Sequence, residues 1–140
     1  MAGRIETPQK IKFIKYIYEK GEGIKSGKIA DKFRIRTATV SRSLHDLGEA
    51  GYITYDPWQK IHLTETGISF ARFLYRRHRI LTLMFTCSGL CEYEACRQAE
   101  AIEHLVPREN IDQICKAMGH PSRASCGIIE HDPACCGECA

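Results

Sequence analysis

Apolar residues recur every three or four positions over most of this chain, and that period predicts amphipathic helices. The first apolar stripe, built largely of isoleucine, follows Thr7-Pro8, a pair typical of a helix start, and ends at Gly21. Two shorter stripes come next, and their expected N-terminal caps are Ser26 and Thr37. The sequence therefore predicts three helices in succession.

The pattern then changes from helical to strand-like. Residues 52–55 and 61–63 are rich in β-favouring side chains, and the polar turn between them contains Pro57. These two runs predict a hairpin. Three helices followed by a hairpin is the arrangement of a winged helix-turn-helix, which we expect over residues 1–63.

Helical periodicity returns after the hairpin. We expect a long helix over residues 64–85, a second over 92–105 and a third over 107–119. The fold class is therefore mainly α, with a helical domain over residues 64–121. The remaining tail, residues 122–140, is rich in Cys, Gly and Pro and too poor in apolar residues to pack alone, so it is either disordered or organised by metal.

The overall composition is that of an ordinary globular protein. Apolar residues make up 44% of the chain and charged residues 26%. No apolar run approaches the roughly 18 residues that a membrane span needs. Residues 1–6 lack the apolar core of a signal peptide. We therefore expect a soluble, cytoplasmic protein with no membrane partner.

Charge is divided unevenly along the chain. Residues 1–86 contain 16 Lys or Arg and 8 Asp or Glu, whereas residues 87–140 contain 4 and 9. A basic first part favours a polyanion such as double-stranded DNA. A winged helix would insert its third helix into the major groove, with the first side chains at base edges and the wing on phosphates. The predicted DNA contacts are Arg36, Thr37, Ala38, Thr39, Ser41, Arg42 and Lys60.

Two other interpretations of this basic surface remain open. The same side chains could be the solvated face of a small helical domain. Winged helices also serve as protein-interaction modules, so the fold does not establish DNA binding. The coincidence of short polar side chains at a helix start with a basic half-chain favours DNA.

The clearest chemical pattern lies in the second predicted helix of the helical domain. At 100° per residue, Cys96, Glu100, Glu103 and His104 fall within an arc of about 100°, apart from the apolar stripe. Two carboxylates and an imidazole one turn apart can hold a divalent ion with one added ligand. The alternative is a solvated acidic face. His78 lies on an apolar stripe and is either a core histidine with a hydrogen-bond partner or that added ligand.

Several segments together resemble the DtxR/MntR family of metal-dependent transcriptional repressors. The resemblance covers about residues 8–122 and is carried by segments in family-like order and spacing: 16–19, 29–30, 39–41, 63–67, 76–79, 103–104 and 119–121. It implies a homodimeric repressor whose winged helix binds a palindromic operator. It also implies that the helical domain dimerises and binds Fe(II) or Mn(II) as corepressor.

The resemblance also assigns ligand positions. It places His78, Glu100, Glu103 and His104 on family metal ligands, with Glu100 where the manganese sensors carry Glu and the iron sensors Cys. Cys96 falls where some iron-dependent members carry a second-site histidine.

Three positions depart from the family pattern. The family takes a further ligand from the first helix, where this chain has Gln9 and Lys12, and Thr82 replaces an ancillary-site carboxylate. A lysine is positive at neutral pH and is a poor metal ligand. Either another residue supplies that ligand, or the switch works differently.

All eight cysteines lie at or beyond Cys87. Isolated ones such as Cys87 and Cys115 suit small core hydrophobes. The tail has the pattern C-x4-H-x3-C-C-x2-C. A second metal centre, for zinc or an iron–sulfur cluster, would draw on Cys91, Cys126, His131, Cys135, Cys136 and Cys139. The alternative is a tail of free or reversibly oxidised thiols.

These observations are compatible with two hypotheses, both of which describe a DNA-binding regulator, and they argue against an enzyme. The first is a repressor controlled by Fe(II) or Mn(II). The second has the same fold but is switched by cysteine chemistry in the C-terminal region. The C-x-x-C at 136–139 has no following helix to lower a thiol pKa, and the chain has neither a phosphate loop nor H-E-x-x-H. We therefore expect no catalytic residues.

Overall fold

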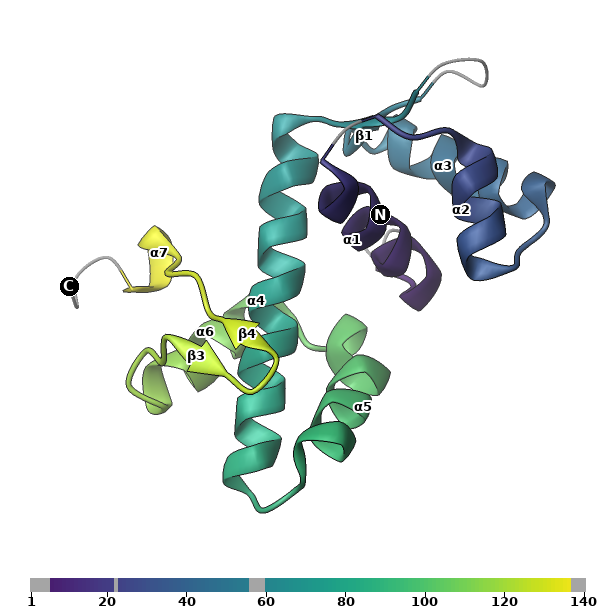
Figure 1. The fold of residues 1–140 in the computed structure, drawn as a ribbon. Coiled ribbons are helices and arrows are strands. Elements are labelled where there is room, and N and C mark those ends of the chain that lie inside the picture. The colour runs from purple at the N-terminus through teal and green to yellow at the C-terminus, as the bar shows by residue number, and fades with distance from the viewer. Residues whose placement is uncertain (1–5, 22, 56–59, 137–140) are drawn as a thin grey trace. The chain divides into compact units, whose positions relative to one another are not determined.

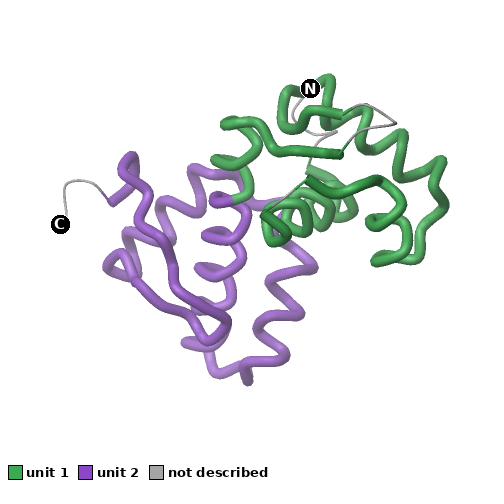
Figure 2. Tube along the Cα trace, turned by 45° about the horizontal axis from the view of Figure 1, so that its top comes forward, with its two compact units in different colours: residues 1–71 green, residues 72–140 purple. Residues whose placement is uncertain are grey.

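The computed structural model describes residues 6–21, 23–55 and 60–136 and is mainly helical, which confirms the expected fold class (Figure 1). It divides into two compact units, residues 1–71 and 72–140 (Figure 2). The division falls inside helix α4 (Glu65–Cys87). The Cys-rich tail is part of the second unit. Among the described residues, no helix has both the length and the apolar character needed to cross a membrane.

The first unit contains the three expected helices, followed by a hairpin. The helices are α1 (Pro8–Lys20), α2 (Ser26–Phe33) and α3 (Thr37–Glu49), and the strands are β1 (Ile53–Thr54) and β2 (His62–Leu63). The strands run antiparallel with Ile53 opposite Leu63, and Ile61 forms an isolated bridge with Ile24. The predicted turn at 56–59 lies outside the described residues. This order of elements agrees with the predicted winged helix-turn-helix.

Of the predicted helix starts in this unit, one is confirmed and two are displaced by a residue. Thr7 is the N-cap of α1, and its hydroxyl accepts a first-turn backbone N–H at 3.3 Å. Ser26 and Thr37 were expected as caps, but each is the first helical residue. The actual N-caps are Lys25 and Arg36, and neither makes a capping side-chain hydrogen bond.

The core of the first unit is largely aliphatic, with Phe13 as its aromatic member, and lies between the helices and the hairpin. It contains the following side chains, each less than 5% exposed: Ile11, Phe13, Ile14, Ile17, Ile29, Val40, Leu44, Leu47, Ile53 and Ile61. One ion pair borders it, in which Lys10 of α1 donates to Asp46 of α3 at 3.0 Å. The buried face of α3 is thus fixed, and its opposite face is left to solvent.

The second unit begins within α4 and continues through short elements. They are α5 (Glu92–Ile102), the 3-10 helix η2 (Glu103–Leu105), α6 (Arg108–Ala117), β3 (Arg123–Ala124), β4 (Gly127–Ile128) and α7 (Pro133–Cys136). The predicted helix over 92–105 is therefore α-helical only to Ile102, and its last three residues are wound more tightly. Arg77 is fully buried and donates to the carbonyl of Val106 at 3.1 Å, which ties α4 to the end of η2.

The tail is folded against α4 through its hairpin. Ala124 and Ile129 are buried, and Arg79 donates to the carbonyl of Ile128 at 2.6 Å. Gly127 has a φ of +150°, and a Cβ there would meet the Arg79 guanidinium. Only glycine lets the backbone approach this closely. The turn of the hairpin, which carries Cys126, is therefore held near α4.

Candidate metal centre and nucleic-acid interface

A buried histidine–carboxylate pair joins α4 to η2. The Nδ1 atom of His78 lies 2.8 Å from a carboxylate oxygen of Glu103. Glu103 is only 3% exposed, and His78 is half-buried. A carboxylate withdrawn from water needs a polar partner, which His78 supplies. His78 therefore has the hydrogen-bond partner that a core histidine needs, and this contact is equally compatible with a ligand role.

Two cysteines lie beside His78 and form the His78 cluster (His78, Cys96 and Cys126). One ligand atom from each residue lies within 4.8 Å of the others. The hydroxyl of Thr82, one turn along α4, donates to the His78 carbonyl at 2.8 Å and lies 3.9 Å from the Cys96 sulfur. The hairpin turn supplies Cys126, which the sequence pattern places with the other tail cysteines.

The two other predicted ligands on this face differ in their surroundings. Glu100 is exposed on α5, whereas Glu103, three residues later, is buried. His104 is half-buried, and its Nδ1 atom is buried with no hydrogen-bond partner among the described residues. Neither Glu100 nor His104 joins the His78 cluster within the described part of the chain. The change from α-helix to 3-10 helix separates side chains that a continuous helix would align.

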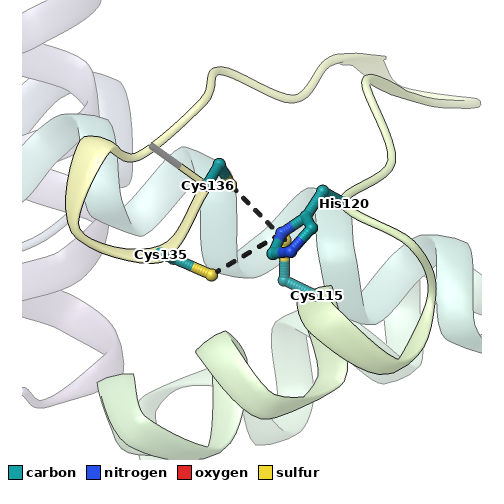
Figure 3. Close-up of side chains that lie close together, drawn as sticks. All are labelled: Cys115, His120, Cys135 and Cys136. Atoms are coloured by element: carbon teal, nitrogen blue, oxygen red, sulfur yellow. Dashed lines mark hydrogen bonds between the residues drawn. The ribbon is translucent and has the colours of Figure 1, made fainter. Parts of the chain in front are cut away.

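A second group of potential ligands, the Cys115 cluster, lies at the end of α6. It consists of Cys115, His120, Cys135 and Cys136, whose ligand atoms all lie within 4.8 Å of one another (Figure 3). The predicted second centre contains Cys135 and Cys136 but neither Cys115 nor His120. The spacing of Cys115 and His120, with four residues between them at the end of a predicted helix, could have indicated this pair.

The other residues of the predicted second centre lie elsewhere. Cys91 is exposed at the start of α5 and belongs to neither cluster. His131 hydrogen-bonds the Cys136 thiol. Cys139 lies outside the described residues. Cys87, which suited a core position, is exposed, so that expectation is wrong, whereas Cys115 is buried as expected.

The two neighbouring thiols of α7 differ in acidity. Burial and the proximity of Cys115 raise the pKa of Cys135 to about 12. Burial alone would also raise the pKa of Cys136, but hydrogen bonds from His131 and the backbone of Asp132 outweigh it and lower that pKa to about 6. Cys136 is therefore the more acidic of the two thiols, and the thiolate is the form that binds soft metal ions.

The predicted DNA contacts lie on the solvent face of α3 and beside the hairpin. The exposed ones are Arg36, Thr37, Ala38, Thr39, Arg42 and Lys60, and Ser41 is half-buried. The apolar side of α3 is fully buried at Val40 and Leu44. The helix thus presents short polar and basic side chains while its core face holds it in place.

Gln9 and Lys12 of α1 stand where the family resemblance places a further metal ligand. The amide oxygen of Gln9 accepts a hydrogen bond from the Ser43 hydroxyl at 3.1 Å, within the first unit. Lys12 is exposed. Neither residue supplies a carboxylate.

Known proteins resemble this chain in both sequence and fold. Residues 64–130 match the model of the iron dependent repressor, metal binding and dimerisation domain. An uncharacterized HTH-type transcriptional regulator of Methanocaldococcus jannaschii is 28% identical over 100 residues, which cover 71% of this chain and 80% of that protein. The transcriptional regulator MntR of Salmonella typhimurium is 31% identical over 84 residues, which cover 60% of this chain and 54% of MntR.

The fold of a solved metalloregulator also matches. The structure of the manganese regulator SloR aligns with a TM-score of 0.73 and 27% identity, over 89% of this chain and 60% of the SloR chain. This chain thus spans about half the length of the Salmonella relative and three fifths of SloR.

Proposed function

We propose that this chain is a member of the DtxR/MntR family of metal-dependent transcriptional repressors, and that it is a homodimeric, cytoplasmic repressor whose operator binding is controlled by Fe(II) or Mn(II). The first unit would bind DNA through α3. The second would dimerise and bind the metal. The match of residues 64–130 to a metal binding and dimerisation domain supports the second assignment.

Two observations carry this proposal: the buried His78–Glu103 pair, and the ring nitrogen of His104, the next residue in the chain, which is buried and unpartnered within the described part of the chain. Glu103 is 3% exposed and bonded to His78, and the Nδ1 atom of His104 is buried without a partner among the described residues. An unpaired buried polar atom costs about 1–3 kcal/mol. A bound metal ion would give the Nδ1 atom of His104 the partner that it lacks among these residues, and this would remove the energetic cost.

The donor types fit Fe(II) or Mn(II). We propose that His78, Glu100, Glu103 and His104 hold the ion, with Cys96 beside His78. His78 and Glu103 are already in contact, and Glu100, exposed on α5, and His104 would close on them when the ion binds. Imidazole and carboxylate ligands suit these ions, and a single thiolate is compatible with Fe(II). When bound, the cation supplies positive charge that holds donors from α4, α5 and η2 together.

The chain's own residues set the chemistry of His78. A carboxylate on Nδ1 keeps the proton on that atom and leaves the Nε2 lone pair free. Glu103 therefore prepares His78 for a metal even where it is not itself a ligand. Because Gln9 is bonded to Ser43 and Lys12 is a cation, we draw the proposed ligands from residues 78–104 alone.

The exposed start of α3 supports sequence-specific DNA binding. Arg42 can donate two parallel hydrogen bonds to a guanine, and Ala38 can contact a thymine methyl group. Arg36 and Lys60 would neutralise phosphates, which sets register but not sequence. A two-fold symmetric dimer requires a palindromic site with half-sites about one helical turn apart.

The test is DNA affinity as a function of metal. Full-length protein is purified anaerobically, and its operator is selected from a random pool of duplex DNA. Affinity is then measured at one salt concentration with no added ion, Fe(II), Mn(II) or Mg(II). We expect Fe(II) or Mn(II) to tighten binding by about 5–150-fold, the usual range of allosteric coupling. Equal affinity with and without Fe(II) and Mn(II) would overturn the proposal.

A matched variant checks that the metal acts through the assigned residues. His78→Ala should lose the metal response but keep the salt-dependent, sequence-independent binding that α3 and the wing supply. Reciprocity gives a second check, because DNA must tighten metal binding by the same factor.

One observation favours a second candidate, the same regulator switched by cysteine chemistry. Cys96 and Cys126 lie together in the His78 cluster, and Cys126 is exposed. A peroxide could take two electrons and two protons from these thiols, forming a disulfide while it is reduced to water or alcohol. Under this alternative, peroxide changes DNA affinity, Cys126→Ser abolishes that change, and added Fe(II) or Mn(II) has no effect. Zinc or an iron–sulfur cluster would act through the same cysteine-rich region.

A further inference from the structure

Four soft ligands meet where the tail returns to α6. The Cys115 sulfur is 3.5 Å from Nδ1 of His120 and 3.9 Å from the Cys136 sulfur. The Cys135 sulfur is 3.9 Å from the same imidazole nitrogen. Figure 3 shows the three segments that contribute: the end of α6, the turn after it and α7. All four side chains are buried or half-buried.

These spacings are those of a tetrahedral metal site. Zn²⁺ binds thiolate sulfur at about 2.3 Å and imidazole nitrogen at about 2.0–2.1 Å. Tetrahedral angles then place two sulfur ligands about 3.8 Å apart, and a sulfur and a nitrogen about 3.6 Å apart. The three separations given above, 3.5, 3.9 and 3.9 Å, lie close to these values. The remaining separations among the four ligand atoms are all within 4.8 Å, so a single ion could lie within reach of all four.

The backbone around the cluster is specialised to bring the ligands together. Gly119 and His120 both have left-handed φ values, +74° and +53°, and the N–H of His120 donates to the carbonyl of Cys115 at 2.8 Å. Such a conformation costs a residue other than glycine about 1–2 kcal/mol. At the other end, Asp132 accepts from the backbone N–H of Ala134 at 2.9 Å and so caps the short helix that carries the last two ligands.

A buried cation lies beside the cluster. Arg76 is 4% exposed, and its Nη1 atom donates to Asp112 at 2.7 Å and lies 3.7 Å from a carboxylate oxygen of Asp132. Its guanidinium also contacts Cys115. Three thiolates, one neutral imidazole and Zn²⁺ carry one net negative charge. Arg76 would reduce that charge only in part, because the two carboxylates already pair with the guanidinium.

We propose that Cys115, His120, Cys135 and Cys136 form a closed structural Zn²⁺ site that fixes α7 to the end of α6. The site is separate from the ligands assigned to Fe(II) or Mn(II) and does not depend on the repressor function. This ligand set differs from the second metal centre predicted from the sequence. It includes Cys115 and His120 and does not include Cys91 or Cys126. His131 acts on it indirectly, through its hydrogen bond to Cys136.

Metal analysis of full-length protein purified without oxygen tests this site. We expect one equivalent of zinc that survives dialysis and remains in His78→Ala. Cys135→Ser should lose it, whereas Cys87→Ser, which alters an exposed cysteine outside both clusters, should retain it. Retention of that zinc by Cys135→Ser, or its loss from His78→Ala, would overturn the assignment.

A titration of the wild-type chain needs no variant and covers the case in which Cys135→Ser fails to fold. Protein stripped by a chelator is titrated with Co²⁺, an optical substitute for zinc. Tetrahedral thiolate ligation gives thiolate-to-cobalt absorption in the near ultraviolet and strong visible bands, and equimolar Zn²⁺ should abolish both. Absence of these bands, the colour of an iron–sulfur cluster in the purified protein, or a Cys115–Cys136 disulfide found by peptide mapping would each refute the proposal.

Discussion

Replacing Glu103 by glutamine should weaken metal binding while leaving the fold intact. Glu103 is 3% exposed, and its carboxylate lies 2.8 Å from Nδ1 of His78. The amide oxygen of glutamine can still accept the imidazole N–H, but a neutral hydrogen bond replaces a charge-assisted one of roughly twice the strength. We therefore expect the metal-free protein to lose only about 1 kcal/mol of unfolding free energy.

The effect on the metal should be larger. Loss of a carboxylate that orients a histidine ligand costs about 10–100-fold in metal affinity, or about 1.4–2.7 kcal/mol. If Glu103 is itself a ligand, the loss is greater. Mn(II) affinity is measured by competition with a fluorescent chelator, and stability by urea unfolding without metal. Glu92→Gln, an exposed change on α5, is the matched control.

Two results would refute this reasoning. One is a Glu103→Gln protein that binds Mn(II) within twofold of the wild type. The other is an equal loss of affinity in Glu92→Gln, which would show that only the total charge of the acidic face matters. Glu103→Ala extends the test, because it leaves His78 unpaired and should cost roughly 1–3 kcal/mol of stability as well as metal affinity.

Three further predictions concern the first unit. Leu44→Ala removes a fully buried side chain of α3 and should lower the urea-unfolding free energy by about 2–5 kcal/mol; a loss below 1 kcal/mol would contradict the described core. Arg42→Ala should cost about 1–3 kcal/mol of operator affinity and relax base preference at one position, with zinc and manganese content unchanged; unaltered base preference in repeated selection would argue against its assignment. Gly67→Ala should destabilise the protein because a Cβ there would meet the Tyr52 carbonyl, whereas Gly27→Ala meets nothing and should not; equal melting temperatures for the two variants would refute the close approach.

The parts of the fold that follow from local chemistry could be predicted from the sequence. Thr7-Pro8 and Thr64 mark helix starts because a hydroxyl accepts a backbone N–H within one turn, and the structure has the Thr64 hydroxyl 3.1 Å from the N–H of Gly67. Ser26 and Thr37 have the same chemistry but stand inside their helices. A cap depends on which of two adjacent residues leaves the helical conformation, and neighbouring segments decide that.

The candidate ligands show the limit of periodicity. Glu100 and Glu103 share an arc on an ideal helix, but the chain tightens after Ile102, and one carboxylate is exposed while the other is buried. Burial of Arg77 and its bond to the Val106 carbonyl accompany this change. A helical projection of residues 92–105 cannot predict this change, because it does not include α4, whose Arg77 bonds to the Val106 carbonyl.

The grouping of cysteines could not be read from their spacing for a similar reason. Cys126 and Cys135 are close in sequence, but the hairpin places one beside His78 and α7 places the other beside Cys115. Hairpin position depends on Gly127 and Arg79, whose contact spans most of the second unit in sequence. The cysteines and histidines by themselves indicate soft-metal chemistry. Which of them lie together in each of the two clusters depends on the fold and could not be predicted from the sequence.

The folded tail has a thermodynamic consequence. Cys126 and Cys135 are nine positions apart, and each end of that segment is held at a different cluster. When one end is anchored, the short connection keeps the other at a high effective concentration near its own site and reduces the loop-closure entropy of docking it. Release of either end returns that entropy to the chain and weakens the attachment of the other. If both clusters hold a ligand, we expect ligand release at one to weaken binding at the other modestly, through the connecting peptide.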